Sequence, residues 1–199
     1  MNLNYGQLLR SPENEIIEQI RKGDVRKYAL LVDRHKDRAF TLAFRLVQDR
    51  EEAEELVQDA FTRAYRSLEQ FRGDAKFSTW LYRIVYNLCM TRVTRRKTRP
   101  ESLDRYEAET HHERFVDDDE PGIDEQMENE DFKNIILEEV NRLPEPYRAA
   151  VALFYLQEMS YDEMTNVLQL PLGTVKTNLF RARNLLRERM SIRLKGEMA

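Results

Sequence analysis

Hydrophobic residues recur every third or fourth position along most of the chain, the period of an amphipathic helix. This period predicts one helix from about Gly23 and a second one, whose first turn Asp49 can cap. A third helix is expected to begin at Trp80, behind a Ser78 or Thr79 cap. Because no segment alternates between apolar and polar residues as a strand does, the sequence predicts an all-α fold.

The C-terminal part of the chain continues the helical period. A helix from about Phe132 is expected to stop at Pro144, and another one follows it. Ser160 and Glu163 then have the spacing of a capping box, and Pro171 interrupts the pattern before a last helix. Two short helices joined by such a turn make a helix-turn-helix, whose second helix enters the DNA major groove.

The last helix separates into an apolar side and a basic side when its residues are placed at about 100° per step. The core stripe consists of Val175, Leu179, Ala182, Leu186 and Met190. The opposite side carries Lys176, Thr177, Phe180, Asn184 and Arg187, flanked by Arg181 and Arg183. Such a basic bias predicts a polyanionic partner. Phe180 either packs on a neighbouring helix or contacts a thymine methyl group.

Composition excludes several classes of protein. No apolar run approaches the roughly 18 residues of a membrane span, and the N-terminus has no secretory signal. Cys89 is the single cysteine, so an internal disulfide is impossible and a reducing, cytoplasmic compartment is expected. The net charge of −4 would argue against a nucleic-acid partner if it were evenly spread along the 199 residues.

The charge is instead segregated along the chain. Residues 101–131 contain 14 acids and two arginines, a local charge of −12 that leaves +8 for the rest. This composition is typical of a disordered linker. We therefore predict two small helical domains, 1–99 and 132–199, held apart by an acidic flexible linker over 100–131.

Two features of the N-terminal domain exceed what a helical core requires. The helix after Asp49 has an acidic outer face, which is either a docking surface or an ordinary solvated face. The block from Arg63 to Asn87 mixes cations with aromatic rings, a combination that suits single-stranded DNA. Within it, Trp80 shares a helical face with Ile84 and is interpreted as core, while Asn87 reads a base edge or points at water.

These segments resemble conserved regions of bacterial sigma factors. The second region is similar to the stretches DREEAEELVQDAF (49–61) and FRGDAKFSTWLYRIVYN (71–87). The fourth is similar to LPEPYR (143–148), MSYDEM (159–164) and PLGTVKTNLFRAR (171–183). Their order, with no third domain between them, is that of the extracytoplasmic-function (ECF) group. A match over both domains is more specific than a lone helix-turn-helix.

The resemblance implies three sets of binding residues. Docking on the clamp of the largest polymerase subunit would involve Asp49, Glu51, Glu52, Glu55, Gln58 and Asp59. Recognition and melting of the minus-ten promoter element would involve Arg63, Phe71, Arg72, Gly73, Lys76, Arg83 and Asn87. A flipped base would sit in a pocket near Phe71, Arg63 and the loop 73–76, with Asn87 beside it. The minus-thirty-five element would be read by Lys176, Thr177, Phe180 and Arg181, with Arg183 on phosphate.

The resemblance also implies the partners: core RNA polymerase through its clamp and the flap of its second subunit, promoter DNA, and an anti-sigma protein. It implies no catalysis, cofactor, metal or membrane insertion. A plain helix-turn-helix regulator would leave the acidic helix and the aromatic-basic block unexplained. An enzyme would need a catalytic constellation, and the sequence shows no phosphate-binding glycine loop or Cys-x-x-Cys pair. His111 and His112 are adjacent in the acidic segment and make poor metal ligands.

Overall fold

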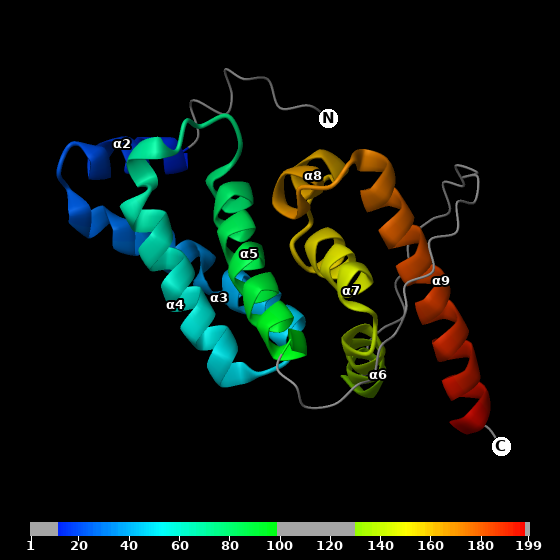
Figure 1. Cartoon of the computed structure of the whole chain (residues 1–199). Coiled ribbons are helices and arrows are strands. Elements are labelled where there is room, and N and C mark those ends of the chain that lie inside the picture. The colour runs from blue at the N-terminus through cyan, green and yellow to red at the C-terminus, as the bar shows by residue number, and fades with distance from the viewer. Residues whose placement is uncertain (1–11, 99–129, 198–199) are drawn as a thin grey trace.

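The computed structural model describes residues 12–98 and 130–197, and every regular element in these ranges is a helix (Figure 1). The N-terminal set is α2 (Pro12–Arg21), η1 (Val25–Lys27), α3 (Tyr28–Val47), α4 (Arg50–Arg66), η2 (Leu68–Gln70) and α5 (Phe77–Thr98). The C-terminal set is α6 (Glu130–Asn141), α7 (Glu145–Val151), the π-helical segment η3 (Ala152–Leu156), α8 (Tyr161–Leu168) and α9 (Leu172–Glu197). The predicted all-α fold is confirmed.

Helix α4 begins and packs as its sequence pattern predicts. The Asp49 side chain accepts a hydrogen bond of 2.9 Å from the backbone N–H of Glu52, so it caps the first turn. The buried stripe is Ala53, Leu56, Val57, Ala60, Phe61 and Ala64. This stripe packs α4 against α3 and α5, and the acidic side of α4 therefore faces outward.

Two helix starts differ from the predictions, and one further helix was not predicted. Helix α5 begins at Phe77, and Thr79 is buried rather than placed as a cap. The Phe77 ring is buried and packs against Trp80, one helical turn later. This packing is favourable when Phe77 already has helical geometry, so the helix begins there. A 3₁₀ turn delays α3 until Tyr28. Helix α2 was missed, although the apolar spacing of Ile17 and Ile20, both buried, is its signal.

The two helical sets pack against each other, so the expectation that they are held apart is wrong. Helices α3 and α5 contact α7, η3 and α8, and Figure 1 shows α5 between α4 and the C-terminal helices. Buried residues from both sets form one hydrophobic cluster. The physical reason is that each set keeps apolar surface after its internal packing, and burying that surface is favourable whatever the charge of the connecting segment. The predicted linker 100–131 lies almost wholly outside the described residues.

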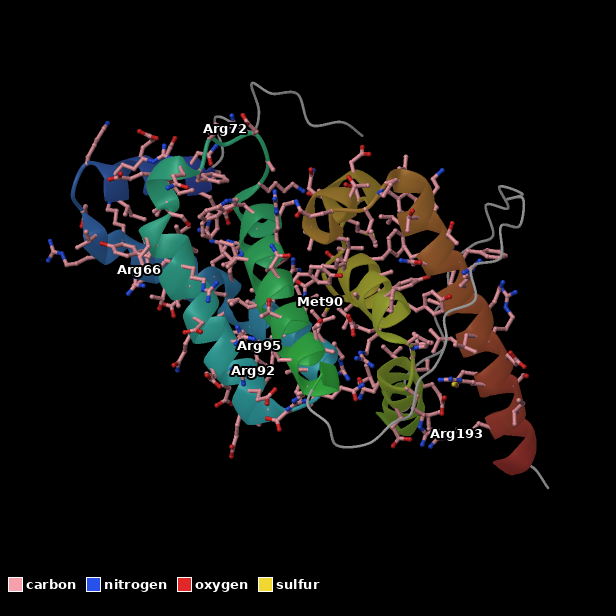
Figure 2. All side chains as sticks on the ribbon, in the orientation of Figure 1. Arg66, Arg72, Met90, Arg92, Arg95 and Arg193 are labelled. Atoms are coloured by element: carbon pink, nitrogen blue, oxygen red, sulfur yellow. The ribbon has the colours of Figure 1, made fainter. Side chains whose placement is uncertain are left out.

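A second, smaller cluster holds α9 to the start of the C-terminal set. It consists of Val140, Leu143, Val151 and Ala182. Arg193 adds ion pairs from α9 to Glu138 (2.8 Å) and to the buried Glu139 (3.2 Å), and Figure 2 shows it beside α6. These contacts give the long helix α9 a fixed direction.

Candidate nucleic-acid interface

The helix-turn-helix consists of α8 and α9. Ser160 and Glu163 form the predicted capping box at the start of α8, with hydrogen bonds in both directions. Gln169 ends α8 in the left-handed conformation with φ of 57°, and α9 begins at Leu172. Val175 and Leu179 are buried as predicted, so the rotation of α9 about its axis is fixed.

The opposite side of α9 is exposed, and it contains the predicted minus-thirty-five residues. Lys176, Phe180 and Arg183 are exposed, with 51% of the Phe180 surface accessible, while Thr177 and Arg181 are half-buried. The Thr177 hydroxyl donates to the Gly173 carbonyl oxygen at 2.7 Å. A large apolar ring among cations suits a surface that contacts both base edges and phosphates.

Aromatic side chains from η3 and α8 hold two cations of α9. The Arg183 guanidinium lies 5.5 Å from the Phe154 ring centroid, and its Nε donates to the Tyr155 hydroxyl at 2.9 Å. Phe154 stacks on Tyr161 at 5.4 Å, and the Lys176 ammonium lies 5.9 Å from the Tyr161 centroid. We call these five residues the aromatic ladder. It limits the freedom of both basic side chains before any ligand binds.

The loop 71–77 is built on a buried aromatic group. Phe71 is buried and contacts Phe77 and Trp80 at centroid distances of 6.0 and 5.2 Å. Trp80 is half-buried and packs against the core, in agreement with its interpretation from the sequence. Gly73 has φ of 77°, a conformation that side-chain-bearing residues rarely adopt, so glycine suits this turn.

Arg21 fixes the base of this loop, a role that sequence reasoning missed. Its Nη2 donates to the carbonyl oxygens of Leu68 (2.9 Å), Glu69 (3.3 Å) and Phe71. A cavity of about 430 Å³ lies between α2 and the loop. It is lined by Asn14, Glu15, Ile17, Glu18, Gln19, Arg21, Lys22, Phe71, Arg72 and Gly73. This lining includes Phe71 from the expected base pocket, but neither Arg63 nor Asn87.

The remaining minus-ten candidates are all exposed, but two of them also contact α8. Arg63, Arg72 and Asn87 are exposed, and Arg72 pairs with Asp74 at 3.1 Å at the outer end of the loop (Figure 2). Lys76 pairs with Glu163 of α8 at 2.8 Å. With the Gln169 amide turned so that its oxygen faces Arg83, that oxygen accepts from Arg83 Nη2 (2.5 Å) and Nε (3.1 Å). All five side chains are therefore accessible, and two of them already have partners on α8.

The predicted docking residues of α4 also fall into two groups. Arg96 pairs with Glu52 at 2.5 Å and lies 3.9 Å from Asp49, while Arg92 pairs with Glu55 at 3.2 Å. Figure 2 shows Arg92 on α5, where this helix faces α4. Cations of α5 lie beside these three carboxylates, although Glu55 stays exposed. The second group, Glu51, Gln58 and Asp59, is exposed as well, and its two carboxylates add to the outward acidic surface.

Three features of the described ranges bear on other kinds of site: groups of metal-ligating residues, the buried His35 and the apolarity of the helices. No group of His, Cys, Asp and Glu there could hold a metal ion, and His111 and His112 lie outside these ranges. His35 is buried, with its Nε2 2.9 Å from Glu13 Oε1, so it is a core residue. Of the helices described, none is both long and apolar enough to cross a membrane.

Comparison with known families matches both halves of the chain. The Sigma-70 region 2 model matches residues 31–99, and the Sigma-70 region 4 model matches residues 133–186. The chain is 35% identical to the ECF RNA polymerase sigma factor SigW of Bacillus subtilis over 87% of this chain and 94% of that protein. It is 34% identical to the ECF sigma-E factor of Escherichia coli K12, over 86% and 90% respectively.

Solved structures with the same fold cover most of the chain. CnrH in complex with the cytosolic domain of CnrY aligns with a TM-score of 0.62 at 21% identity, over 89% of this chain and 96% of that one. The sigma factor RpoE of Bartonella quintana, in complex with the anti-sigma factor NepR, aligns with a TM-score of 0.60 at 22% identity, over 85% and 98%. Sigma factors bind core RNA polymerase and promoter DNA. With both sigma regions matched in order, the chain belongs to the ECF group of RNA polymerase sigma factors and acts in transcription initiation.

Proposed function

We propose that three surfaces divide the work of initiation. The acidic face of α4 docks on the clamp of the largest polymerase subunit, while the C-terminal domain contacts the flap of the second subunit. Helix α9 reads the minus-thirty-five element, and the loop 71–77 with α5 recognises and helps melt the minus-ten element. The chain does this in the cytoplasm and without catalysis of its own.

The observation that carries this proposal is the orientation of α9. Its buried residues leave Lys176, Phe180 and Arg183 outward on one face. An α-helix with this face fits the major groove, where cations contact phosphates or guanine and an apolar ring contacts the thymine methyl group. Lys at 176 is a point charge rather than a planar fork, which favours phosphate contact or single hydrogen bonds over bidentate guanine reading.

We also propose a role for each segment of the chain. We assign residues 1–99 to polymerase binding and minus-ten recognition, 100–131 to the acidic linker, and 132–199 to minus-thirty-five recognition. The linker has the charge of the RNA whose place it would take in the polymerase channel. Because two proteins of the same fold are solved in complexes with other proteins, one of them a named anti-sigma factor, we also propose an anti-sigma partner here.

Reconstituted transcription tests the proposal. Purified core polymerase with this chain should initiate from a cognate promoter, whereas core polymerase alone should not. A plain helix-turn-helix regulator would bind the promoter duplex without conferring initiation on the core enzyme. Absence of initiation from every promoter of the native genome would contradict the proposal.

A matched pair of isosteric substitutions tests the docking face. Asp59→Asn removes an outward charge. We expect it to weaken core binding about three- to tenfold, because it removes one side of a charge pair across the interface, and the strength of such pairs varies from case to case. Asp49→Asn keeps a good N-cap and removes a charge already near Arg96, so core binding should change less than twofold. Core affinity is measured by titration with labelled chain. A larger effect from Asp49→Asn would place the docking surface on the α5 side of α4.

A further inference from the structure

Arg21, the last residue of α2, contacts the segment that leads into the loop 71–77. Its Nη2 donates to the carbonyl oxygens of Leu68 (2.9 Å), Glu69 (3.3 Å) and Phe71. Leu68 and Glu69 belong to η2, the turn that ends at Gln70 directly before the loop. One guanidinium group therefore joins α2 to the backbone at the start of the loop, 47 to 50 residues further along the chain.

The direction of the Arg21 side chain follows from the packing of α2. Ile17 and Ile20 are buried, so the rotation of α2 against the core is fixed. Helix α2 contacts η2, and Figure 1 shows it beside the end of α4. Glu18, one turn earlier, pairs with Arg21 Nη1 at 2.7 Å, so both terminal nitrogens have acceptors. Because 27% of the side chain is accessible, these contacts, and not deep burial, hold the guanidinium in place.

Phe71 is held from two sides. Its carbonyl oxygen accepts from Arg21, while its buried ring packs against Phe77 and Trp80. Two residues later the chain turns at Gly73, whose φ is positive. The loop therefore starts from a point at which both the backbone and the side chain are fixed.

Arg21 and Arg72 both line the cavity between α2 and the loop, but their partners differ in kind. Arg72 pairs with Asp74, and 84% of its side chain is accessible, so it can exchange this partner for a phosphate. Arg21 Nη2 instead donates to backbone oxygens. Its contacts therefore act on the shape of the loop, while Arg72 is placed to contact DNA.

We propose that Arg21 is a positioning residue for minus-ten recognition, which holds the start of the loop 71–77 and thereby the shape of the pocket that receives the unpaired base. The inference rests on the minus-ten role proposed for this loop. A pocket that is ordered before DNA arrives discriminates better between bases, because less order has to be imposed on binding. Arg21 precedes the stretch 31–99 that matches the Sigma-70 region 2 model.

Three variants separate the carbonyl contacts from charge. Arg21→Met keeps a long side chain and removes every donor, whereas Arg21→Lys keeps the charge without the planar fork of donors. Lys22→Met is the matched control, because it removes the same charge from the next residue, on the lining of the same cavity. Core binding should stay unchanged in all three, since neither residue lies on α4. Thermal unfolding should change little, because the contacts are partly exposed.

The base preference of initiation is the main readout. Core polymerase with each variant is assayed on promoters in which every position of the minus-ten element is replaced in turn by the other three bases. Arg21→Met should lower the preference for the native base at one or more positions about two- to fivefold. Arg21→Lys should be intermediate, and Lys22→Met should match the wild type. A purely structural role would lower initiation from all promoters by the same factor, and that result would overturn the proposal.

Salt dependence separates positioning from direct DNA contact. The probes are a single-stranded oligonucleotide with the non-template minus-ten strand, and a duplex with the minus-thirty-five element, both from a promoter found in the transcription assay. Loss of one phosphate contact should lower the salt slope of single-strand binding by about 0.7, and we expect this for Arg72→Met. Arg21→Met should keep the wild-type slope, and duplex binding should not change in either variant. A lowered slope in Arg21→Met would make Arg21 a DNA ligand and overturn the positioning role.

Amide hydrogen exchange in the free chain tests the holding contact without DNA or polymerase. Arg21→Met should speed exchange in the loop 71–77 about two- to fivefold relative to Lys22→Met, because the start of the loop is released. Equal exchange in the two variants would overturn the inference and leave the proposed function intact. Failure of the wild-type chain to initiate from any promoter would instead overturn the proposed function.

Discussion

The two surfaces proposed to read DNA differ in the partners of their cations. The minus-thirty-five face of α9 projects outward, and its cations are held in place by rings from its own domain. The minus-ten surface around the loop 71–77 has two of its cations in contact with the other domain. The difference shows that two exposed binding surfaces of one chain can differ in whether their cations already have partners on another set of helices.

The comparison also separates two ways of placing a cation. Lys176 and Arg183 lie beside aromatic rings, which orient a cation without neutralising it. Lys76 instead faces a carboxylate, which orients it and also cancels its charge. A surface of the first kind is ready for DNA, while one of the second kind has to exchange its partner first.

The largest expected effect concerns the open surface. Phe180→Ala should lower affinity for minus-thirty-five duplex DNA about tenfold, since loss of one base-specific contact costs about 1–3 kcal/mol. Single-strand binding should not change. Fluorescence anisotropy with both probes measures this, and Ile192→Ala is the matched control, because Ile192 is another exposed apolar residue of α9. Equal losses in the two variants would show that exposed apolar area, not a base contact, sets the affinity.

The next largest effect concerns the proposed minus-ten surface. Asn87→Ala should slow promoter opening about three- to tenfold, because a polar side chain that pairs with a base edge contributes about 1 kcal/mol or more. Binding to core polymerase should stay unchanged, since Asn87 is exposed on α5 and not on α4. Opening is followed by permanganate reactivity of unpaired thymines. Loss of core binding instead would contradict the division of work within the N-terminal domain.

A smaller effect tests the aromatic ladder. Tyr161→Leu should weaken minus-thirty-five binding about two- to fivefold, because an exposed cation–π contact contributes roughly 0.5–1 kcal/mol. Tyr161→Phe keeps the ring and should restore binding. Duplex affinity is measured over a range of salt concentrations. If Tyr161→Phe is as weak as Tyr161→Leu, the hydroxyl and not the ring positions Lys176.

The smallest effect concerns a partly buried ion pair that packs beneath the loop 71–77. His35 lies 5.4 Å from the Phe77 ring, and its hydrogen bond is the main cause that holds the Glu13 pKa below the ordinary 4.5. Glu13→Gln should therefore lower the free energy of unfolding by about 1 kcal/mol at neutral pH.

The pH dependence has a definite sign. A carboxyl with a lowered folded-state pKa stabilises the fold above its unfolded pKa, and this stabilisation is lost as pH falls through the folded value. The gap between wild type and Glu13→Gln should shrink as pH falls below 4.5. Urea unfolding at several pH values measures it. A gap that persists at pH 3 would assign the effect to packing.

Much of the local structure could be predicted from the sequence because its causes are local. The Asp49 cap, the Ser160–Glu163 box and the core stripe of α9 each depend on residues within one or two turns. The start of α5 could not be predicted in this way, since Phe77 is buried in the core and contacts His35 of α3, far away in the sequence. Helix α2 had a usable signal in Ile17 and Ile20 that was not read.

The sequence by itself determined the helices, their apolar faces and which side of α9 carries positive charge, because periodicity and capping act over a few residues. Only the tertiary structure decided which charges pair with one another. Glu163 meets Lys76, and Arg96 meets Glu52, across long stretches of chain. Such pairs depend on how helices pack, and packing depends on the combined apolar surface of both domains rather than on any local pattern.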